Sequence, residues 1–239
     1  MEVQLRPTAY SAALLVAALV EVQRRMPAAA LEVGVGGGVV SAAMLKAGVP
    51  RLDGVDILPD AVEASSGLLA QLGLDGRAHL RVGNLWDSFD SGPARPQWDL
   101  IVCNPPQFPL LAPLHEDHPR TWSDGGQDGR LVLQPLLEGL PERLHPGGVA
   151  LLTHNRFIGL DRSLEELSRA GLQVSIGPAV WVPLSEQRAN ALRATHAAWG
   201  VATRIEDELG IICVGAHLIV SFVVMRACKP KPAGSQATQ

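Results

Sequence analysis

Aromatic residues are scarce in this 239-residue chain and make up only 4% of it. A folded core must then be built from aliphatic side chains, and the hydrophobic fraction of 47% is large enough for that. The charged fraction of 18%, beside so large a hydrophobic fraction, excludes a disordered chain. The length fits one good-sized domain, or a domain with a small addition.

An excess of positive charge is also missing. Lysine and arginine number 20 against 24 aspartate and glutamate residues, and the net charge is -4. Proteins that bind nucleic acids by releasing counterions usually carry more basic than acidic residues. A nucleic acid is therefore the less favoured partner, although a local basic patch is compatible with this composition.

Cysteines are few and widely spaced. Cys103, Cys213 and Cys228 form no C-x-x-C pair and leave one cysteine over, which excludes a disulfide framework and a zinc knuckle. We expect reduced thiols, as in a cytoplasmic protein. The segment 115–118 reads His-Glu-Asp-His, but an H-x-x-H without further ligands is a weak zinc signal. We expect a polar surface loop there and no metal site.

Long hydrophobic runs are absent as well. The two longest, residues 9–20 and 211–225, are shorter than the ~18 residues that a membrane-spanning helix needs. Residues 9–30 share some features with a signal peptide, but Glu2 is unfavourable at its start, and the next segment begins a cofactor-binding fold. We expect a soluble, cytoplasmic protein without a membrane partner.

Strands and helices alternate along most of the chain. This alternation predicts an α/β fold, with a doubly wound, mostly parallel sheet that is covered on both faces. The expected helices cover residues 8–25, 38–47, 59–72, 129–144, 162–170 and 185–199, and the expected strands cover residues 30–34, 52–57, 78–82, 99–103, 149–153, 172–182 and 211–226. We expect a single domain over residues 1–228 and a flexible tail over 229–239. Residues 185–200 form either a helical cap inserted in this domain or a plain solvent-exposed helix.

The first chemical signal is the glycine-rich segment 32–38, which reads Glu-Val-Gly-Val-Gly-Gly-Gly between an expected strand and an expected helix. Glycines let the backbone turn sharply and approach a ligand closely, and the next helix offers free N–H groups. Asp56 ends the following expected strand, at about the ~20-residue offset of a carboxylate that binds ribose hydroxyls. A structural turn would explain the glycines alone, but the combination predicts a site for an adenosine-containing cofactor.

The spacing of the glycines indicates which cofactor this is. The dinucleotide fingerprint G-x-G-x-x-G needs Gly or Ala where Val39 stands. The pattern G-x-G-x-G after Glu32 resembles instead the glycine loop of class I S-adenosylmethionine (SAM)-dependent methyltransferases, and the resemblance covers about residues 5–226. It implies SAM as the cofactor and a Rossmann-like fold whose seven-stranded sheet has an antiparallel strand near the C-terminus. The implied cofactor-binding residues are Thr8, Glu32, Gly34, Gly36, Asp56, Ile57, Asn84, Leu85 and Asn104.

The most specific motif is Asn104-Pro105-Pro106-Gln107, at the end of the expected strand 99–103. A Pro-Pro turn with a turn-forming asparagine would explain it structurally. Its place at the carboxyl end of a strand, where open α/β sheets bind ligands, favours a catalytic role. It resembles the N-P-P-aromatic motif of methyltransferases that act on a nitrogen conjugated to a π-system, either a glutamine amide or an exocyclic amine of adenine or guanine.

The chemistry of such a nitrogen explains these residue types. Its lone pair is delocalised, so it is a poor nucleophile. The Asn104 side-chain oxygen and the Pro105 carbonyl can accept its two N–H bonds, hold it in line with the methyl group and favour pyramidalisation. Prolines stiffen the backbone that carries these acceptors. No strong base is needed before methyl transfer.

Three further segments resemble release-factor glutamine methyltransferases. Arg-Pro-Thr at 6–8 resembles a segment that lies over the cofactor, and Asp-Gly-Gly-Gln-Asp-Gly at 124–129 resembles a signature of that group. Leu-His-Pro-Gly-Gly at 144–148 matches a turn that is widespread in class I enzymes. The resemblance implies a protein glutamine as the methyl acceptor.

Three departures leave the acceptor open. Gln107 stands where the family has Tyr or Phe to pack on the flat acceptor group. The glycine loop begins near residue 32, so the amino-terminal helical domain that grips a release factor is not expected, and residues 153–156 lack the family's acidic-glycine continuation. A small-molecule or peptide amide therefore fits as well as a protein glutamine. A nucleobase is the third alternative, because the chain is acidic and has few aromatics for stacking.

Several residues are candidates for the substrate side. Phe108 and Trp122 could supply the packing surface that Gln107 does not. His154 is either an acceptor for a proton late in turnover or a structural histidine whose ring nitrogens are hydrogen-bonded. Trp98 and Trp181 are expected in the core.

Two other classes of function fit parts of the sequence. A nicotinamide oxidoreductase would use a similar fold, but Val39 and the lack of a Tyr-Lys or His-Asp pair count against it. A SAM-binding module without catalysis would not need an intact Asn-Pro-Pro. The sequence therefore predicts a SAM-dependent N-methyltransferase. Its predicted catalytic residues are Asn104, Pro105, Pro106 and Gln107, and its predicted substrate contacts are Phe108, Trp122 and His154.

Overall fold

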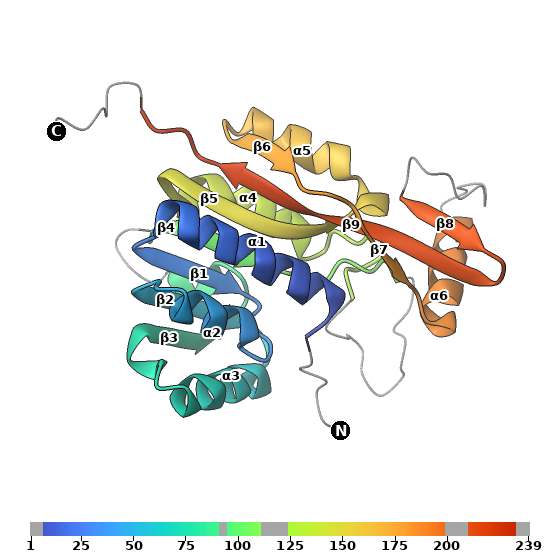
Figure 1. Ribbon diagram of the computed structural model, residues 1–239. Helices are drawn as coiled ribbons and strands as arrows, with labels where there is room; N and C mark the ends of the chain where they lie inside the picture. Colours follow the sequence, from blue (N-terminus) through green and yellow to red (C-terminus); the bar gives the residue numbers. More distant parts are fainter. Residues whose placement is uncertain (1–6, 91–94, 111–123, 199–209, 233–239) are drawn as a thin grey trace.

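The computed structural model describes residues 7–90, 95–110, 124–198 and 210–232, which fold as a helix-covered sheet (Figure 1). The helices are α1 (Ala9–Arg25), α2 (Val39–Lys46), α3 (Pro59–Gln71), α4 (Leu133–Arg143), α5 (Leu160–Arg169) and α6 (Glu186–Ala198). The strands are β1 (Ala29–Val33), β2 (Arg51–Asp56), β3 (Ala78–Val82), β4 (Trp98–Cys103), β5 (Leu144–Asn155), β6 (Gln173–Ile176), β7 (Val180–Pro183), β8 (Ile211–Val214) and β9 (His217–Cys228).

The sheet has the strand order β3-β2-β1-β4-β5-β9-β6, and β7 and β8 also pair with β9. The five strands from β3 to β5 are parallel, whereas β9 is antiparallel to β5. The predicted doubly wound sheet with an antiparallel strand near the C-terminus is therefore confirmed. The order reverses between β1 and β4, and open α/β sheets bind ligands at such a point.

Two predicted strands are each divided in the structure, so the described part of the chain forms a sheet of nine strands and not seven. Residues 172–182 form β6 and β7, because Gly177 and Pro178 lie between them and proline has no N–H for a ladder. Residues 211–226 form a hairpin of β8 and β9, in which Gly215 turns the chain with a φ of 60°.

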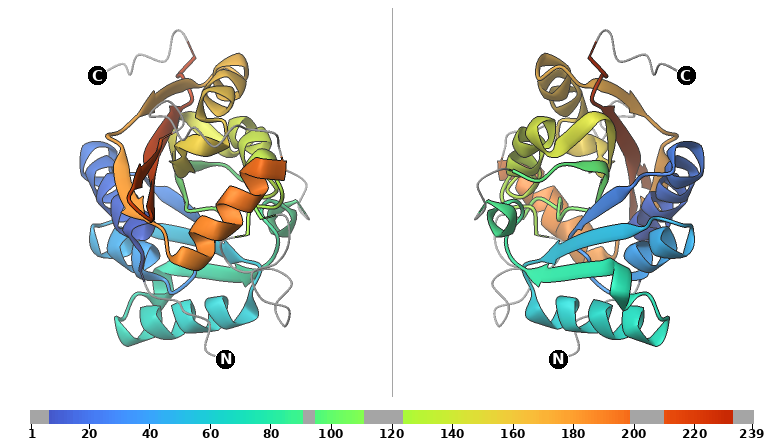
Figure 2. Two further views of the ribbon diagram at one scale, coloured as in Figure 1. Left: turned by 90° about the vertical axis from the view of Figure 1, so that its right-hand side faces the viewer. Right: turned by 90° about the vertical axis from the view of Figure 1, so that its left-hand side faces the viewer.

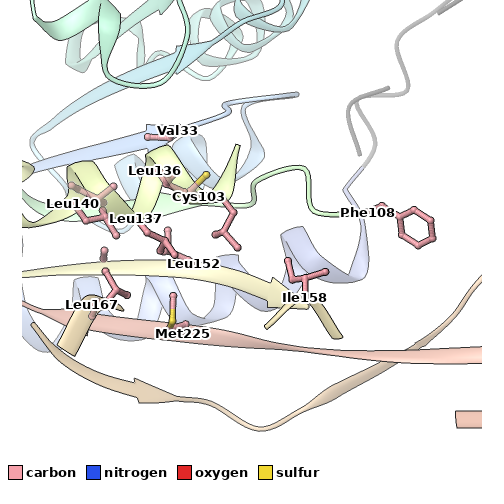
Figure 3. Close-up of a cluster of buried hydrophobic side chains, with 14 of the residues drawn as sticks. Val33, Cys103, Phe108, Leu136, Leu137, Leu140, Leu152, Ile158, Leu167 and Met225 are labelled. Carbon is pink, nitrogen blue, oxygen red and sulfur yellow. The ribbon is translucent and has the colours of Figure 1, made fainter. Parts of the chain in front are cut away.

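Helices cover both faces of the sheet, as the two turned views show (Figure 2). On one face, α1, α2 and α3 pack on alternate residues of the central strands, such as Leu100 and Leu151. On the other face, α4 and α5 pack on the intervening residues, and Figure 3 shows Leu137 of α4 beside Leu152 of β5. This alternation is the consequence of successive side chains pointing to opposite faces of a strand.

The carboxyl-terminal part of the chain extends beyond the end of β5. Residues 222–228 of β9 pair with β5, but residues 217–220 continue past it and pair with β8. On its other edge β9 pairs first with β7 and then with β6. Helix α6 lies beside this extension, at the edge of the sheet where the parallel strands end (Figure 1).

The two tryptophans that we expected in the core have different environments. Trp98 is 1% exposed, packs edge-to-face on Phe89 and donates a hydrogen bond from Nε1 to Asp53 Oδ2 at 2.8 Å. The prediction for Trp181 is wrong, because this side chain is 41% exposed on β7, at the edge of β9. Among the described residues, no helix is both long enough and apolar enough to cross a membrane.

Candidate active site

A cleft of about 250 Å³ opens at the carboxyl ends of β1, β2 and β4. It gathers side chains from the start of α1, the glycine-rich loop, the end of β2, the segment after β3 and the motif after β4. The lining includes every residue that the sequence proposed for the cofactor, together with two prolines of the motif: Thr8, Glu32, Gly34, Gly36, Asp56, Ile57, Asn84, Leu85, Asn104, Pro105 and Pro106.

The glycine-rich loop turns between β1 and α2 with three glycines in the left-handed region, two of which line the cleft. Gly34 has a φ of 78° and Gly36 a φ of 50°, which other residues adopt only with strain. A Cβ atom added to either glycine would have no neighbouring atom within 4 Å. Both glycines line the cleft, and the space beside their Cα atoms is open.

Asp56 holds this loop in place. Its Oδ2 accepts a hydrogen bond from the Gly36 N–H at 3.0 Å, and its Oδ1 accepts one from the Leu58 N–H at 3.0 Å. Each carboxylate oxygen has two lone pairs, so one remains on each for another donor. The side chain is therefore already oriented when a hydroxyl-bearing ligand arrives.

Glu32 is a buried carboxyl group at the bottom of the cleft. The Ser41 hydroxyl donates a hydrogen bond to its Oε2. Burial raises the pKa of Glu32 to about 8, and the nearby charge of Asp56 adds to this rise, against the effect of the Ser41 hydrogen bond. Burial also raises the pKa of the neighbouring Cys103 thiol, with further contributions from Glu32 and Asp56. At neutral pH both groups are therefore protonated in the ligand-free protein.

Two lining segments come from outside the central strands. Thr8 caps α1, and its Oγ1 accepts a hydrogen bond from the Ser11 N–H at 3.3 Å. After β3, Leu85 has a φ of 47°, a strained conformation for a bulky residue. It is held by a turn in which the Asp87 N–H donates to the Asn84 carbonyl at 3.1 Å. Strain of this kind is concentrated at ligand-binding positions.

Asn104 follows β4 directly, and its neighbour is set by the register of the sheet. Cys103 pairs with Leu152 of β5, which brings the next residues of both strands, Asn104 and Thr153, side by side. The Thr153 hydroxyl donates a hydrogen bond to Asn104 Oδ1 at 2.6 Å. The carbonyl of Pro105 accepts one from Gln107 Nε2 at 3.2 Å. Both oxygens keep a lone pair for a further donor.

Gln107 does not line the cleft. Its side chain is 3% exposed and points into the end of the sheet, where Nε2 donates to the Thr153 carbonyl at 2.7 Å. Its Oε1 accepts from the Asn155 N–H at 2.9 Å. The structure therefore separates Gln107 from the three motif residues before it, because these hydrogen bonds hold its amide behind the motif.

Two of the three predicted substrate contacts, Phe108 and His154, are described, and neither joins the cleft lining. Phe108 is buried and packs edge-to-face on Phe157 at 6.4 Å, with Arg188 of α6 over its ring. His154 is fully buried, and its ring nitrogens bond the Asn155 carbonyl and the Ser163 hydroxyl. Burial lowers the pKa of His154 to about 4, so it is neutral. This geometry fits the structural role for His154.

Two predictions fall on segments that the structure does not describe. Trp122 and the loop 115–118 lie outside the described residues. Among the described ones there is no cluster of three or more residues that could hold a metal ion. Conversely, Ser41 and Thr153 are site residues that were not predicted. The spacing of nine residues between Glu32 and Ser41 is a weak signal, and Thr153 is recognised only once the register of β4 and β5 is known.

Comparison with known proteins shows the family to which this chain belongs. The family model described as methyltransferase small domain matches residues 9–175. Over 195 residues the chain is 29% identical to a putative protein N5-glutamine methyltransferase of Methanocaldococcus jannaschii, covering 78% of this chain and 92% of the relative. It is 32% identical over 173 residues to a ribosomal protein uL3 glutamine methyltransferase of Bordetella pertussis, covering 70% and 54% of the two chains.

Other matches cover less of the partner or show only the fold. The chain is 34% identical over 137 residues to a release factor glutamine methyltransferase of Geobacter sulfurreducens, covering 54% and 46% of the two chains. It thus spans about half the length of that enzyme and of the uL3 enzyme. The crystal structure of YcgJ from Bacillus subtilis superposes with a TM-score of 0.61 and 13% identity, covering 91% and 98% of the chains. The chain belongs to the methyltransferase small domain family, and it is a methyltransferase.

Proposed function

We propose that this chain transfers a methyl group from SAM to the side-chain amide nitrogen of a protein glutamine. One observation carries the proposal. The two oxygens suited to hold an amide nitrogen, on Asn104 and Pro105, belong to residues that line the same cleft as Asp56 and the glycine-rich loop. Acceptor and methyl donor would therefore meet in one cleft.

The residues of the cleft fit SAM. Asp56 keeps a free lone pair on each carboxylate oxygen for the ribose hydroxyls. Ile57 and Leu85 offer apolar side chains for a flat base, and the amide oxygen of Asn84 can accept from the adenine amino group. Glu32 lines the same cleft, and a positively charged ligand bound there would favour the ionised form of its carboxyl group. When bound, SAM supplies a methyl group that is activated by a positively charged sulfur.

The acceptor nitrogen is held by oxygens and not by a base. An amide nitrogen has little nucleophilicity because its lone pair is delocalised into the carbonyl. Asn104 Oδ1 and the Pro105 carbonyl can accept its two N–H bonds and orient its lone pair toward the cleft. The prolines keep the backbone rigid, so this arrangement exists before the acceptor binds.

The names of the relatives support a glutamine acceptor, since enzymes acting on uL3 and on release factors share about a third of their residues with this chain over the matched regions. Such acceptors are cytoplasmic, and the proposal therefore places the enzyme in the cytoplasm. A small-molecule or peptide amide is the second candidate. It is favoured by Gln107, because this buried side chain cannot pack on the flat acceptor group as the family's Tyr or Phe does.

The test is methyl transfer from labelled SAM. The protein is incubated separately with a purified release factor, with ribosomal protein uL3, with a glutamine-containing peptide and with total RNA. We expect label on a glutamine side chain of one of the two proteins, located by tandem mass spectrometry, and no label with Asn104→Ala. Label in the peptide alone would favour the second candidate. Label in RNA alone, or none in any acceptor, would refute the proposal.

A further inference from the structure

We propose that Gln107 and Thr153 are positioning residues that set which end of the Asn104 amide faces the acceptor nitrogen. This inference rests on the proposed function. The side chain of an asparagine has a carbonyl oxygen and an NH2 group of nearly the same shape, and rotation by half a turn exchanges them. Only the oxygen can accept an N–H of the acceptor. The NH2 group in its place would face another donor.

The orientation of Gln107 is fixed by groups that have only one hydrogen-bonding role. The Asn155 backbone N–H can only donate, so the atom 2.9 Å away must be the Gln107 oxygen. The carbonyls of Thr153 and Pro105 can only accept, so the Gln107 NH2 group must face them, at 2.7 and 3.2 Å. No other orientation of this buried amide satisfies all three backbone groups.

The orientation of Gln107 then decides that of the Thr153 hydroxyl. Gln107 Nε2 also faces Thr153 Oγ1, at 3.5 Å, and a donor at this position turns the hydroxyl proton away from itself. On its other side the hydroxyl lies 2.6 Å from the Asn104 side chain. The hydroxyl therefore donates toward Asn104, and a donating hydroxyl selects the oxygen of that amide. Thr153 is completely buried, so water does not compete for this hydrogen bond.

This arrangement explains why a glutamine can follow Asn-Pro-Pro. An aromatic side chain at position 107 could not donate to Pro105 and Thr153 while accepting from Asn155. Gln107 instead occupies one lone pair on the Pro105 carbonyl, and Thr153 occupies one on Asn104 Oδ1. One acceptor position is left on each oxygen, which matches the two N–H groups of a primary amide.

Kinetics with four variants test this role. Thr153→Val removes the hydroxyl at constant shape, and Thr153→Ser restores it. Gln107→Met removes the donor to Pro105, and Ser163→Ala is the control, because it deletes another buried hydroxyl that bonds His154 and Arg130 but not the motif. With the release factor or uL3 as acceptor, we expect kcat to fall about tenfold or more in Thr153→Val and Gln107→Met. SAM affinity should stay within about twofold in all four.

The conservative variants separate positioning from stability. Thr153→Ser and Ser163→Ala should keep kcat within about threefold of the wild type, because neither removes the donor to Asn104. A kcat for Thr153→Val as high as that of Ser163→Ala would overturn the inference. An equally large loss of kcat in Thr153→Ser would overturn it too, since the hydroxyl would then not be what matters.

A spectroscopic measurement decides the inference without any acceptor. The chain has only four asparagines, so their labelled side-chain amides give few NMR signals, and Asn104→Ala identifies the one of interest. In the complex with S-adenosylhomocysteine, we expect the Asn104 carbonyl carbon to shift in Thr153→Val and Gln107→Met, but not in Thr153→Ser or Ser163→Ala. An unchanged signal in Thr153→Val would overturn the inference. If the signal shifts but no acceptor is methylated, the proposed function fails and the positioning role stands.

Discussion

At the scale of single residues, Asp56 has two tasks that one substitution would abolish together. Its carboxylate holds the glycine-rich loop through the Gly36 N–H and keeps lone pairs free for the ribose. Asp56→Ala should weaken SAM binding by about 1.5–3 kcal/mol, the usual range for a hydrogen bond to a charged group. Isothermal titration with SAM measures it. Asp60→Ala is the matched control, since this exposed carboxylate lies outside the cleft lining, and equal affinities for the two variants would remove Asp56 from the site.

Asn104 should affect catalysis and not binding of the cofactor. Asn104→Ala removes one of the two acceptors for the substrate nitrogen and leaves the contacts of Asp56 and the glycine-rich loop intact. We expect SAM affinity within a few-fold of the wild type and a loss of turnover of about a hundredfold, as for the removal of a preorganised group at the reacting centre. Single-turnover rates at saturating SAM measure this effect. Turnover within a few-fold of the wild type would show that the nitrogen is held elsewhere.

Sequence patterns predicted which residues meet in the cleft. They did not predict the direction of the side chains next to it. Asp56 and Asn104 could be placed because the ends of parallel strands meet at one edge of a sheet. The burial of Gln107 could not be placed, since it depends on the carbonyl of Thr153 and the N–H of Asn155 in another strand. Short-range patterns carry no information on such pairs.

At the scale of elements, helix α1 connects the stability of the fold with the shape of the cleft. Thr8 caps the helix by accepting from the Ser11 N–H, and it lines the cleft at the same time. Thr8→Ala should lower the free energy of unfolding by about 1 kcal/mol, as the loss of a cap usually does. It should also weaken SAM binding, because the first turn of α1 forms one wall. Urea denaturation and titration measure the two effects.

The control for the cap is Thr8→Ser, which keeps a hydroxyl acceptor at the same position. Both effects should then disappear. A loss of stability in Thr8→Ser as large as that in Thr8→Ala would show that the threonine methyl group, and not the cap, stabilises the start of α1.

The elements themselves differ in how well the sequence predicts them. The boundaries of α1 and β3 are predicted to within a residue, because a cap and a regular apolar pattern define them. The division of residues 172–182 and 211–226 into two strands each is not predicted. In both cases glycine or proline interrupts the chain, at Gly177, Pro178 and Gly215, and the resulting strands pair with β9 on its two edges.

At the scale of the whole molecule, the buried carboxyl of Glu32 makes stability depend on pH. Its pKa is about 8 in the folded protein against an ordinary value of 4.5, so the folded state holds a proton that the unfolded state has lost. The stabilisation is complete below pH 4.5 and is lost as the pH rises toward 8. We expect the free energy of unfolding of the wild type to fall over this range more steeply than that of Glu32→Gln.

Glu32→Gln is the appropriate comparison because it has the same shape and can still accept from the Ser41 hydroxyl. All other titrating groups are common to the two proteins. The difference between their unfolding free energies at pH 5.5 and at pH 8 therefore isolates Glu32. Parallel pH profiles would show that this carboxyl is ionised in the folded protein.

Strand β9 belongs to two parts of the molecule at once. Residues 222–228 complete the sheet beside β5, and the same strand continues without a break into the pairing with β7 and β8. A strand that is paired on both edges does not bend as a hinge. We therefore expect the sheet formed by β7, β8 and β9 to move as one rigid unit with β5. An acceptor that binds beside these strands would meet a preorganised surface. The conformational entropy lost on binding would then come from the acceptor and not from this part of the enzyme.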